Sequence, residues 1–267
     1  MDLTRRAFIA SSLAGTAGLC VGGLEIRGFA ADAAALPPDE DGYKLWLRYA
    51  PPGEAARSYR KVVRQIRVDG TSTTSGIIRD ELRSATSAML GSAVPLNSED
   101  LSDDNLIVGT QANSALIRDL NWSADLSAVG DQGYIIRSAR IGNGSVTVIA
   151  ANTELGALYG SFHFLRLMQT GQRIDKLETA ERPALQRRLM NHWDNPNGTI
   201  ERGYAGRSMW QWNELPEKLS PRYANHARAC SSIGINGAVI NNVNADPSGS
   251  MDRGLRRRIC GIAGARR

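Results

Sequence analysis

Cysteine and histidine are scarce in this sequence, and their scarcity excludes several kinds of site. The 267 residues include three cysteines, of which Cys20 lies near the amino end, Cys260 near the carboxyl end and Cys230 alone between them. No disulfide framework and no metal-binding spacing can be assembled from this set. The histidines are equally scattered, at His163, His192 and His226. We therefore expect no metal ion and no organic cofactor.

The formal net charge of +5 suggests a nucleic-acid partner only until its distribution is considered. Met251 to Arg267 holds six arginines and one aspartate, which accounts for the whole excess. The rest of the chain is balanced, and a balanced body lacks the basic face that nucleic acids require. Hydrophobic residues make up 42% of the chain, enough for a folded core, so we expect a globular protein that does not bind nucleic acid.

Residues 1–33 have the pattern of an export signal. Arg5 and Arg6 precede the stretch from Ala7 to Leu24, which carries no charge and is rich in Ala, Gly and Ser. This pattern is typical of a bacterial twin-arginine leader and predicts an exported protein, periplasmic or extracellular, without stable membrane association after cleavage. The alternative is a short membrane anchor.

Strand and helix patterns alternate along residues 34–180. We expect strands at 43–49, 63–68, 105–110, 133–138 and 145–150, and helices at 75–90, 114–120 and 154–169. Gly142-Asn143-Gly144 predicts a hairpin turn, and Asn152 or Thr153 can cap the last helix. His163 lies beside the apolar stripe of that helix, where packing is a simpler explanation than function. The segment is therefore interpreted as a small α/β domain.

A second unit is expected over residues 181–247. Arg187 to Asp194 predicts a strand followed by a polar, aromatic loop, Pro221 to Ser232 a helix, and Ile235 to Val243 an apolar strand. Together they form one βαβ step, which predicts a parallel pair of strands. Residues 248–267 show neither a strand nor a helix period and are interpreted as an aberrant basic tail.

The chemistry is concentrated in the segment from Asn191 to Trp212, which contains three of the five tryptophans. Aromatic faces stack on sugar rings, while carboxylates and amides bind the hydroxyl groups. Trp193-Asp194-Asn195 follows the first strand of the βαβ step, and Asn241-Asn242-Val243 ends the second. In a (β/α)₈ barrel these carboxyl ends lie side by side. The alternative is that Trp193 is a core residue and the asparagines only turn the chain.

The string NHWDN…GTIERGYAG, from Asn191 to Gly206, resembles the start of the catalytic barrel in α-glucuronidases of glycoside hydrolase family 67. Gly234 to Ala245 is similar to the next part of that barrel, and the preceding α/β segment resembles the family's N-terminal domain. The resemblance implies a small α/β domain followed by the first βαβ portion of a truncated (β/α)₈ TIM barrel.

The resemblance also implies a reaction. Family members remove 4-O-methylglucuronic acid from xylo-oligosaccharides with inversion, using one carboxylic acid and one carboxylate base. Trp193 matches a tryptophan of the glucuronic-acid pocket, and Val243 matches an apolar residue beside the 4-O-methyl group. The other substrate-binding candidates belong to the matching motifs: Asp194, Asn195, Glu201, Arg202, Asn241 and Asn242. The implied partners are xylo-oligosaccharides that bear methylglucuronic acid; the oligomeric state is not indicated.

The sequence departs from the family pattern after Pro247, because the family's acid and base lie on later strands. We therefore expect no catalytic residue in this chain, a truncated and inactive product, and a tail that resembles out-of-frame translation. Glu201 is interpreted as structural or substrate-positioning. Two alternatives remain, a non-catalytic or vestigial carbohydrate-binding fragment and a hexosaminidase-like hydrolase.

Overall fold

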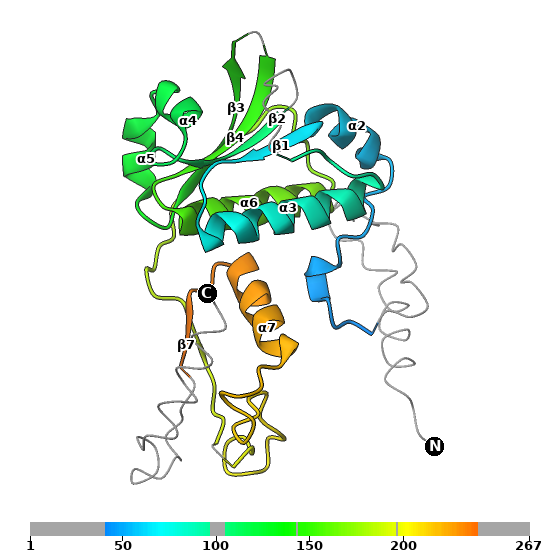
Figure 1. Ribbon diagram of the computed structural model, residues 1–267, viewed down its shortest axis with the longest axis vertical. Helices are drawn as coiled ribbons and strands as arrows, with labels where there is room; N and C mark the ends of the chain where they lie inside the picture. Colours follow the sequence, from blue (N-terminus) through cyan, green and yellow to red (C-terminus); the bar gives the residue numbers. More distant parts are fainter. Residues whose placement is uncertain (1–40, 97–104, 143, 196, 240–267) are drawn as a thin grey trace, which may run out of the picture. The chain divides into compact units, whose positions relative to one another are not determined.

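The computed structural model describes residues 41–96, 105–142, 144–195 and 197–239 (Figure 1). The elements below all belong to the unit that begins at Lys44. The helices are η1 (Leu45–Arg48), α2 (Ala55–Val62), α3 (Thr73–Leu90), α4 (Ala115–Asp119), α5 (Ser123–Val129), α6 (Glu154–Gln169) and α7 (Pro221–Ser232). The strands are β1 (Gln65–Val68), β2 (Asn105–Thr110), β3 (Tyr134–Ile141), β4 (Gly144–Ala151), β5 (Glu178–Glu181), β6 (Leu189–Asn191) and β7 (Gly237–Val239). The predicted leader 1–33 and tail 248–267 lie outside the described residues.

A five-stranded sheet in the order β1-β2-β4-β3-β5 forms the centre of the α/β part, which is the segment that contains these strands (Figure 1). β1, β2 and β4 are parallel, while β3 runs antiparallel to both β4 and β5. Successive strand residues alternate between two cores: Leu106 and Val108 pack with α3 and α6, whereas Ile107 packs with α4 and α5. Helices therefore cover both faces of the sheet, which is why β2 is buried along its whole length. The expected α/β class is confirmed.

Local sequence signals explain the two long helices. The Ser72 hydroxyl accepts a hydrogen bond from the Ser75 N–H at the start of α3, and Gly91 ends that helix in the left-handed conformation. Thr153 caps α6 in the same way by accepting from the Gly156 N–H. Of the two predicted cap residues, Thr153 is therefore the one that caps; Asn152 donates instead to backbone carbonyls near α5.

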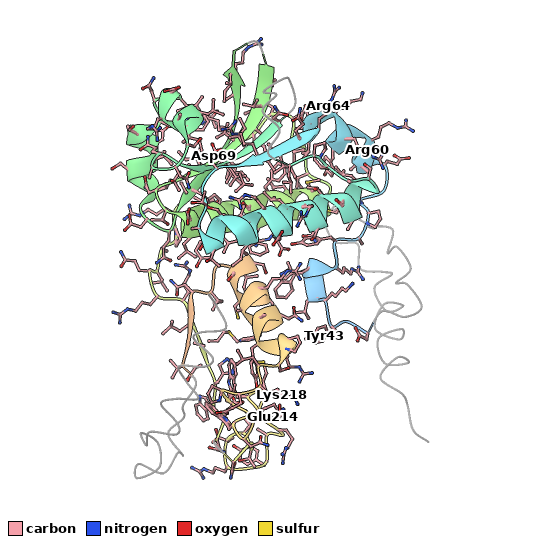
Figure 2. The ribbon with its side chains drawn as sticks, in the orientation of Figure 1. Tyr43, Arg60, Arg64, Asp69, Glu214 and Lys218 are labelled. Carbon is pink, nitrogen blue, oxygen red and sulfur yellow. The ribbon has the colours of Figure 1, made fainter. Side chains whose placement is uncertain are left out.

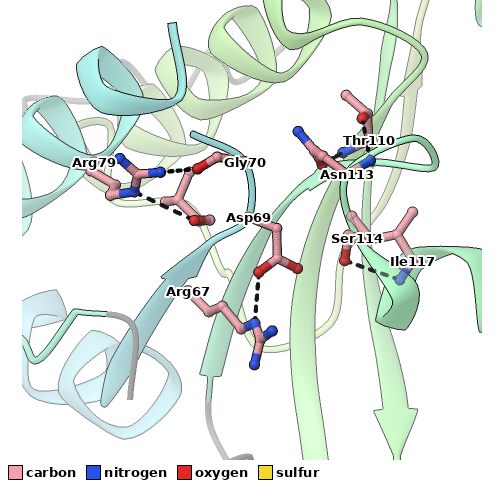
Figure 3. A network of polar contacts seen from close by, with 9 residues as sticks. Arg67, Asp69, Gly70, Arg79, Thr110, Asn113, Ser114 and Ile117 are labelled. Carbon is pink, nitrogen blue, oxygen red and sulfur yellow. Dashed lines mark hydrogen bonds and ion pairs between the residues drawn. The ribbon is translucent and has the colours of Figure 1, made fainter. Parts of the chain in front are cut away.

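A polar network occupies the carboxyl ends of β1 and β2 (Figure 3). Arg67 donates to Asp69 at 2.8 Å, and Arg79 donates to the Gly70 carbonyl. Beyond β2, the Asn113 carboxamide accepts from the Thr110 N–H at 2.8 Å. These bonds hold the loops that lead into α3 and α4.

The carboxylate of Glu154, the first residue of α6, reaches this network. It accepts hydrogen bonds from the hydroxyls of Ser72 and Ser75 and from the Asn113 amide, the last two at 2.8 and 3.2 Å. A Cβ atom at Gly70 would lie 2.5 Å from the Ser75 hydroxyl and 2.7 Å from the Asn113 amide. Glycine is required there because the cluster fills the space beside the backbone, and Gly70 has a φ of +104°.

The prediction of a strand at 43–49 is wrong, because residues 45–48 form the short helix η1. Leu45 and Tyr49 both have a φ of 52°, in the left-handed region, so the segment cannot extend. Leu47 and Tyr49 are nevertheless buried, and their two-residue spacing produced the strand-like pattern. Three elements were not expected: α2, α5 and β5.

The expected βαβ step is confirmed. β6 and β7 pair in parallel with α7 between them in sequence, and the Arg188 side chain and N–H bind Gly234 and Asn236 next to β7. α7 packs against α6, and a partly buried ion pair ties it to α3: Arg228 donates to both carboxylate oxygens of Glu81, at 2.6 and 2.7 Å. The Tyr49 hydroxyl donates to the same carboxylate. Burial and the Glu81 charge raise the pKa of Tyr49, so its hydroxyl keeps its proton.

Candidate functional site

The loop between β6 and α7, residues 192–220, carries most of the predicted site (Figures 1 and 2). Trp193 comes directly after β6 and His192, and 44% of its surface is exposed. The alternative of a core tryptophan is therefore wrong. The indole is exposed on a loop whose neighbouring residues are held by hydrogen bonds.

Asp194 differs from its neighbour in being only 5% exposed. Its carboxylate accepts a hydrogen bond from the Ser208 hydroxyl at 2.5 Å and lies 3.7 Å from Nδ1 of His192. The Ser208 hydroxyl also accepts from the Trp210 N–H at 3.0 Å. Asp194 therefore joins the start of the loop to its middle at Ser208.

Asn195 turns the chain, as the alternative interpretation of the asparagines predicted for this position. Its amide donates to the Thr199 hydroxyl at 2.8 Å and to the Glu201 carbonyl at 2.6 Å. The Glu201 N–H donates back to the Trp193 carbonyl at 2.8 Å, and Glu201 has a φ of 55°. The loop thus brings Trp193, Asn195 and Glu201 together, with Arg202 exposed beside them.

The other two tryptophans of the segment are not available to a sugar. Trp210 and Trp212 are each 3% exposed and form a small core with Leu215 and Tyr223. The Tyr223 hydroxyl accepts from the Gln211 N–H at 2.8 Å, so α7 holds this part of the loop. Trp193 therefore stays the candidate for stacking among the three tryptophans of this segment.

Two histidines that the sequence left without a role support this core. The His192 ring meets the rings of Trp210 and His226 edge to face, each at 5.3 Å between centroids. The spacing of Tyr223 and His226 on α7 could have indicated one shared helix face. Elsewhere, His163 is packed as expected: it bonds the Tyr134 hydroxyl at 2.9 Å, and burial lowers its pKa.

The predicted residues Asn241, Asn242 and Val243 lie outside the described residues. The described end of β7 is bonded to the start of the loop, since the His192 N–H donates to the Val239 carbonyl at 2.8 Å. Within the described ranges, no three side chains of His, Cys, Asp or Glu are grouped to hold a metal ion. No helix in that same part of the chain is long and apolar enough to cross a membrane.

Comparison with known proteins identifies relatives of both parts of the chain. The profile described as the glycosyl hydrolase family 67 N-terminus matches residues 45–164, and that of the family 67 middle domain matches residues 167–266. Alpha-glucuronidase A from Emericella nidulans is 34% identical over 221 residues, covering 78% of this chain and 25% of that protein. An alpha-glucuronidase from Hypocrea jecorina is 32% identical over 237 residues, covering 80% of this chain and 26% of that protein.

The chain thus spans about a quarter of the length of these curated relatives. Among solved structures, similarity was found to a family GH115 4-O-methyl-alpha-glucuronidase with specificity for decorated arabinogalactans. The TM-score is 0.48 at 16% identity, over 66% of this chain and 25% of that one.

Proposed function

Because this chain belongs to glycoside hydrolase family 67, the α-glucuronidases, we propose that its loop after β6 forms part of the pocket for a glucuronic acid side group. The observation that carries the proposal is the 44% exposure of Trp193 on a loop whose neighbouring residues are held by hydrogen bonds. A rigid aromatic face binds a sugar ring at little cost in conformational entropy.

The proposed ligand is a (4-O-methyl)glucuronic acid on a xylo-oligosaccharide. The sugar ring would stack on Trp193, and the carboxylate of the glucuronic acid would bind to a cationic side chain. Arg202 is exposed on the same loop and supplies a fork of N–H donors that suits a carboxylate. In this proposal the buried carboxylate of Asp194, which accepts from Ser208, holds the loop instead of contacting the sugar.

We propose that the hydrolysis proceeds with inversion. A water oxygen attacks the anomeric carbon as the glycosidic C–O bond breaks; a carboxylate base takes the proton of the water and a carboxylic acid protonates the leaving oxygen. The resemblance assigns that acid and base to later barrel strands. The described loop then binds and orients the sugar, and Glu201 helps to shape the loop through its bonded backbone.

An extracellular or periplasmic location is part of the proposal and rests on the pattern of residues 1–33. The bacterial source, the twin-arginine route and the assignment of the βαβ step to the start of a TIM barrel stay predictions.

Calorimetric titration of the 267-residue chain tests the proposal. An aldouronic acid should bind, whereas an undecorated xylo-oligosaccharide of the same length should bind more weakly. Trp193→Ala should weaken binding of the aldouronic acid roughly tenfold, the effect of about 1.4 kcal/mol of lost stacking. Trp193→Phe should retain part of it, and Trp122→Phe, a change at the start of α5, serves as the matched control.

Equal affinities for Trp193→Ala and the unaltered chain would contradict the role of the indole. The assignment of Glu201 has its own test, the release of methylglucuronic acid from the same ligand. Any release that disappeared in Glu201→Gln would show that this carboxylate takes part in the chemistry.

A further inference from the structure

The turn that carries Trp193 fixes which of its side chains face inward. Asp194 pairs with Ile200 as an isolated antiparallel bridge, and beside it the Glu201 N–H donates to the Trp193 carbonyl at 2.8 Å. In extended backbone, successive side chains point to opposite sides. Asp194 is 5% exposed, whereas Trp193 is 44% exposed. The contact that keeps Asp194 inward therefore also sets the side to which the Trp193 indole points.

Ser208 provides that contact. Its hydroxyl donates to Oδ2 of Asp194 at 2.5 Å and accepts from the Trp210 N–H at 3.0 Å. The Ser208 N–H donates to the Gly198 carbonyl at 2.9 Å, and the residue is 7% exposed. A hydrogen bond of this length to a carboxylate is charge-assisted and belongs to the stronger kind. One buried residue thus joins the start of the loop, its turn and the aromatic core that Tyr223 of α7 completes.

Loss of the Ser208 hydroxyl would release Asp194 from the interior of the loop. A buried carboxylate that has lost this donor gains free energy by turning towards water. Nδ1 of His192 lies 3.7 Å from the other carboxylate oxygen, which is too far to replace a hydrogen bond. Because Trp193 and Asp194 are adjacent in extended backbone, a rotation that exposes the carboxylate moves the indole away from its present side.

We propose that Ser208 is a positioning residue of the sugar site: acting through Asp194, it holds the Trp193 indole in the orientation that stacks on the glucuronic acid ring. Ser208 is buried, so it acts on the sugar through its neighbours and not by contact. A pre-organised aromatic face binds a ligand at a lower entropic cost than a mobile one, so the hydroxyl contributes affinity. This inference rests on the proposed function, because it requires Trp193 to bind the sugar.

A double-mutant cycle in sugar binding tests the proposal, measured by calorimetric titration of the full chain with an aldouronic acid. Ser208→Ala should weaken binding roughly fivefold, less than the roughly tenfold loss expected for Trp193→Ala, because the indole is kept but no longer held. In the Trp193→Ala background, the same change should have no further effect, within about twofold, because residues that act through one another are not additive. A purely structural role of Ser208 would give the same loss in both backgrounds.

Two further variants separate positioning from stability. Ser161→Ala deletes another buried hydroxyl, which donates to the Ala157 carbonyl at 2.8 Å inside α6, so it should change the stability of the protein and leave its affinity for the aldouronic acid unchanged. Ser208→Cys keeps the volume of the side chain and replaces the hydroxyl by a weak donor. It should show the same Trp193-dependent loss of affinity and takes the place of Ser208→Ala if that variant does not fold.

The binding data distinguish a failure of this inference from a failure of the proposed function. Full affinity in folded Ser208→Ala or Ser208→Cys, or an equal loss with and without the Trp193 indole, would overturn the positioning role of Ser208 and leave the proposed function standing. Full affinity in Trp193→Ala would overturn both.

Discussion

Removing the Arg228 side chain should destabilise the protein far more than removing a surface cation. Arg228 makes two hydrogen bonds to Glu81, whose side chain is 7% exposed, so Arg228→Met leaves a buried carboxylate that still accepts from the Tyr49 hydroxyl but has lost its cation. Loss of one partner from a buried pair costs about 3–5 kcal/mol. We expect the lower end, about 3 kcal/mol, because 34% of the Arg228 side chain is exposed and water can partly replace it.

A double-mutant cycle measured by urea unfolding, with tryptophan fluorescence as the signal, provides the assay. Glu81→Gln alone should cost about 1–2 kcal/mol, because an amide still accepts from Tyr49. The double variant should cost less than the sum of the single variants by about 1–2 kcal/mol, which is the coupling expected for contacting residues.

The exposed pair Glu214 and Lys218, 3.1 Å apart on the loop before α7, supplies the matched control (Figure 2). Lys218→Met should cost no more than about 0.5 kcal/mol. If Arg228→Met cost no more than Lys218→Met, or if the two changes of the cycle were additive, the Arg228–Glu81 pair would not be what holds α7 to α3.

Three further predictions concern the α/β part. Gly160→Ala should destabilise the protein by about 1–2 kcal/mol in thermal unfolding, because the new Cβ would lie 2.6 Å from the Ile149 methyl. Gly76→Ala, whose new Cβ would have nothing within 4 Å, should stabilise it by up to about 1 kcal/mol. Hydrogen bonds lower the pKa of Glu154 below 4.5. The stability that the Glu154 carboxylate contributes at higher pH should therefore be lost as the pH falls below 4.5 and through this lowered pKa, and Glu154→Gln should flatten this part of the Tm–pH curve. Burial lowers the pKa of His163 below 6.5, so the protein should lose stability as the pH falls below 6.5. The His163→Gln variant should not show this loss. A Tm–pH curve unchanged by either substitution would contradict the corresponding pKa shift.

Periodicity predicted the elements whose burial is regular. α3, β2, the β3–β4 hairpin and α6 all carry repeated apolar positions with caps or turns at their ends. α2 was missed because its eight residues, AARSYRKV, bury little beyond Ala56 and Tyr59, which is too little for a period to emerge. η1 was misread because burial two residues apart does not distinguish a strand from an irregular segment.

The site was predictable in its location and less so in its geometry. The motif from Asn191 to Gly206 identified the loop, and parallel pairing of β6 and β7 followed from their apolar runs. Which side chains face outward depends on contacts distant in sequence: Asp194 is buried because Ser208 lies against it, and Trp210 because Tyr223 does. Such pairs leave no period in the sequence.

The Glu154 cluster has a consequence for what the α/β part can bind. In many open α/β sheets, a ligand phosphate lies at the carboxyl ends of the parallel strands, against a helix N-terminus. Here a carboxylate of the chain itself takes the hydroxyl and amide donors at the start of α3. An incoming nucleotide would meet a negative charge where it needs donors. The donors at this edge of the sheet are therefore already occupied by a side chain of the chain itself.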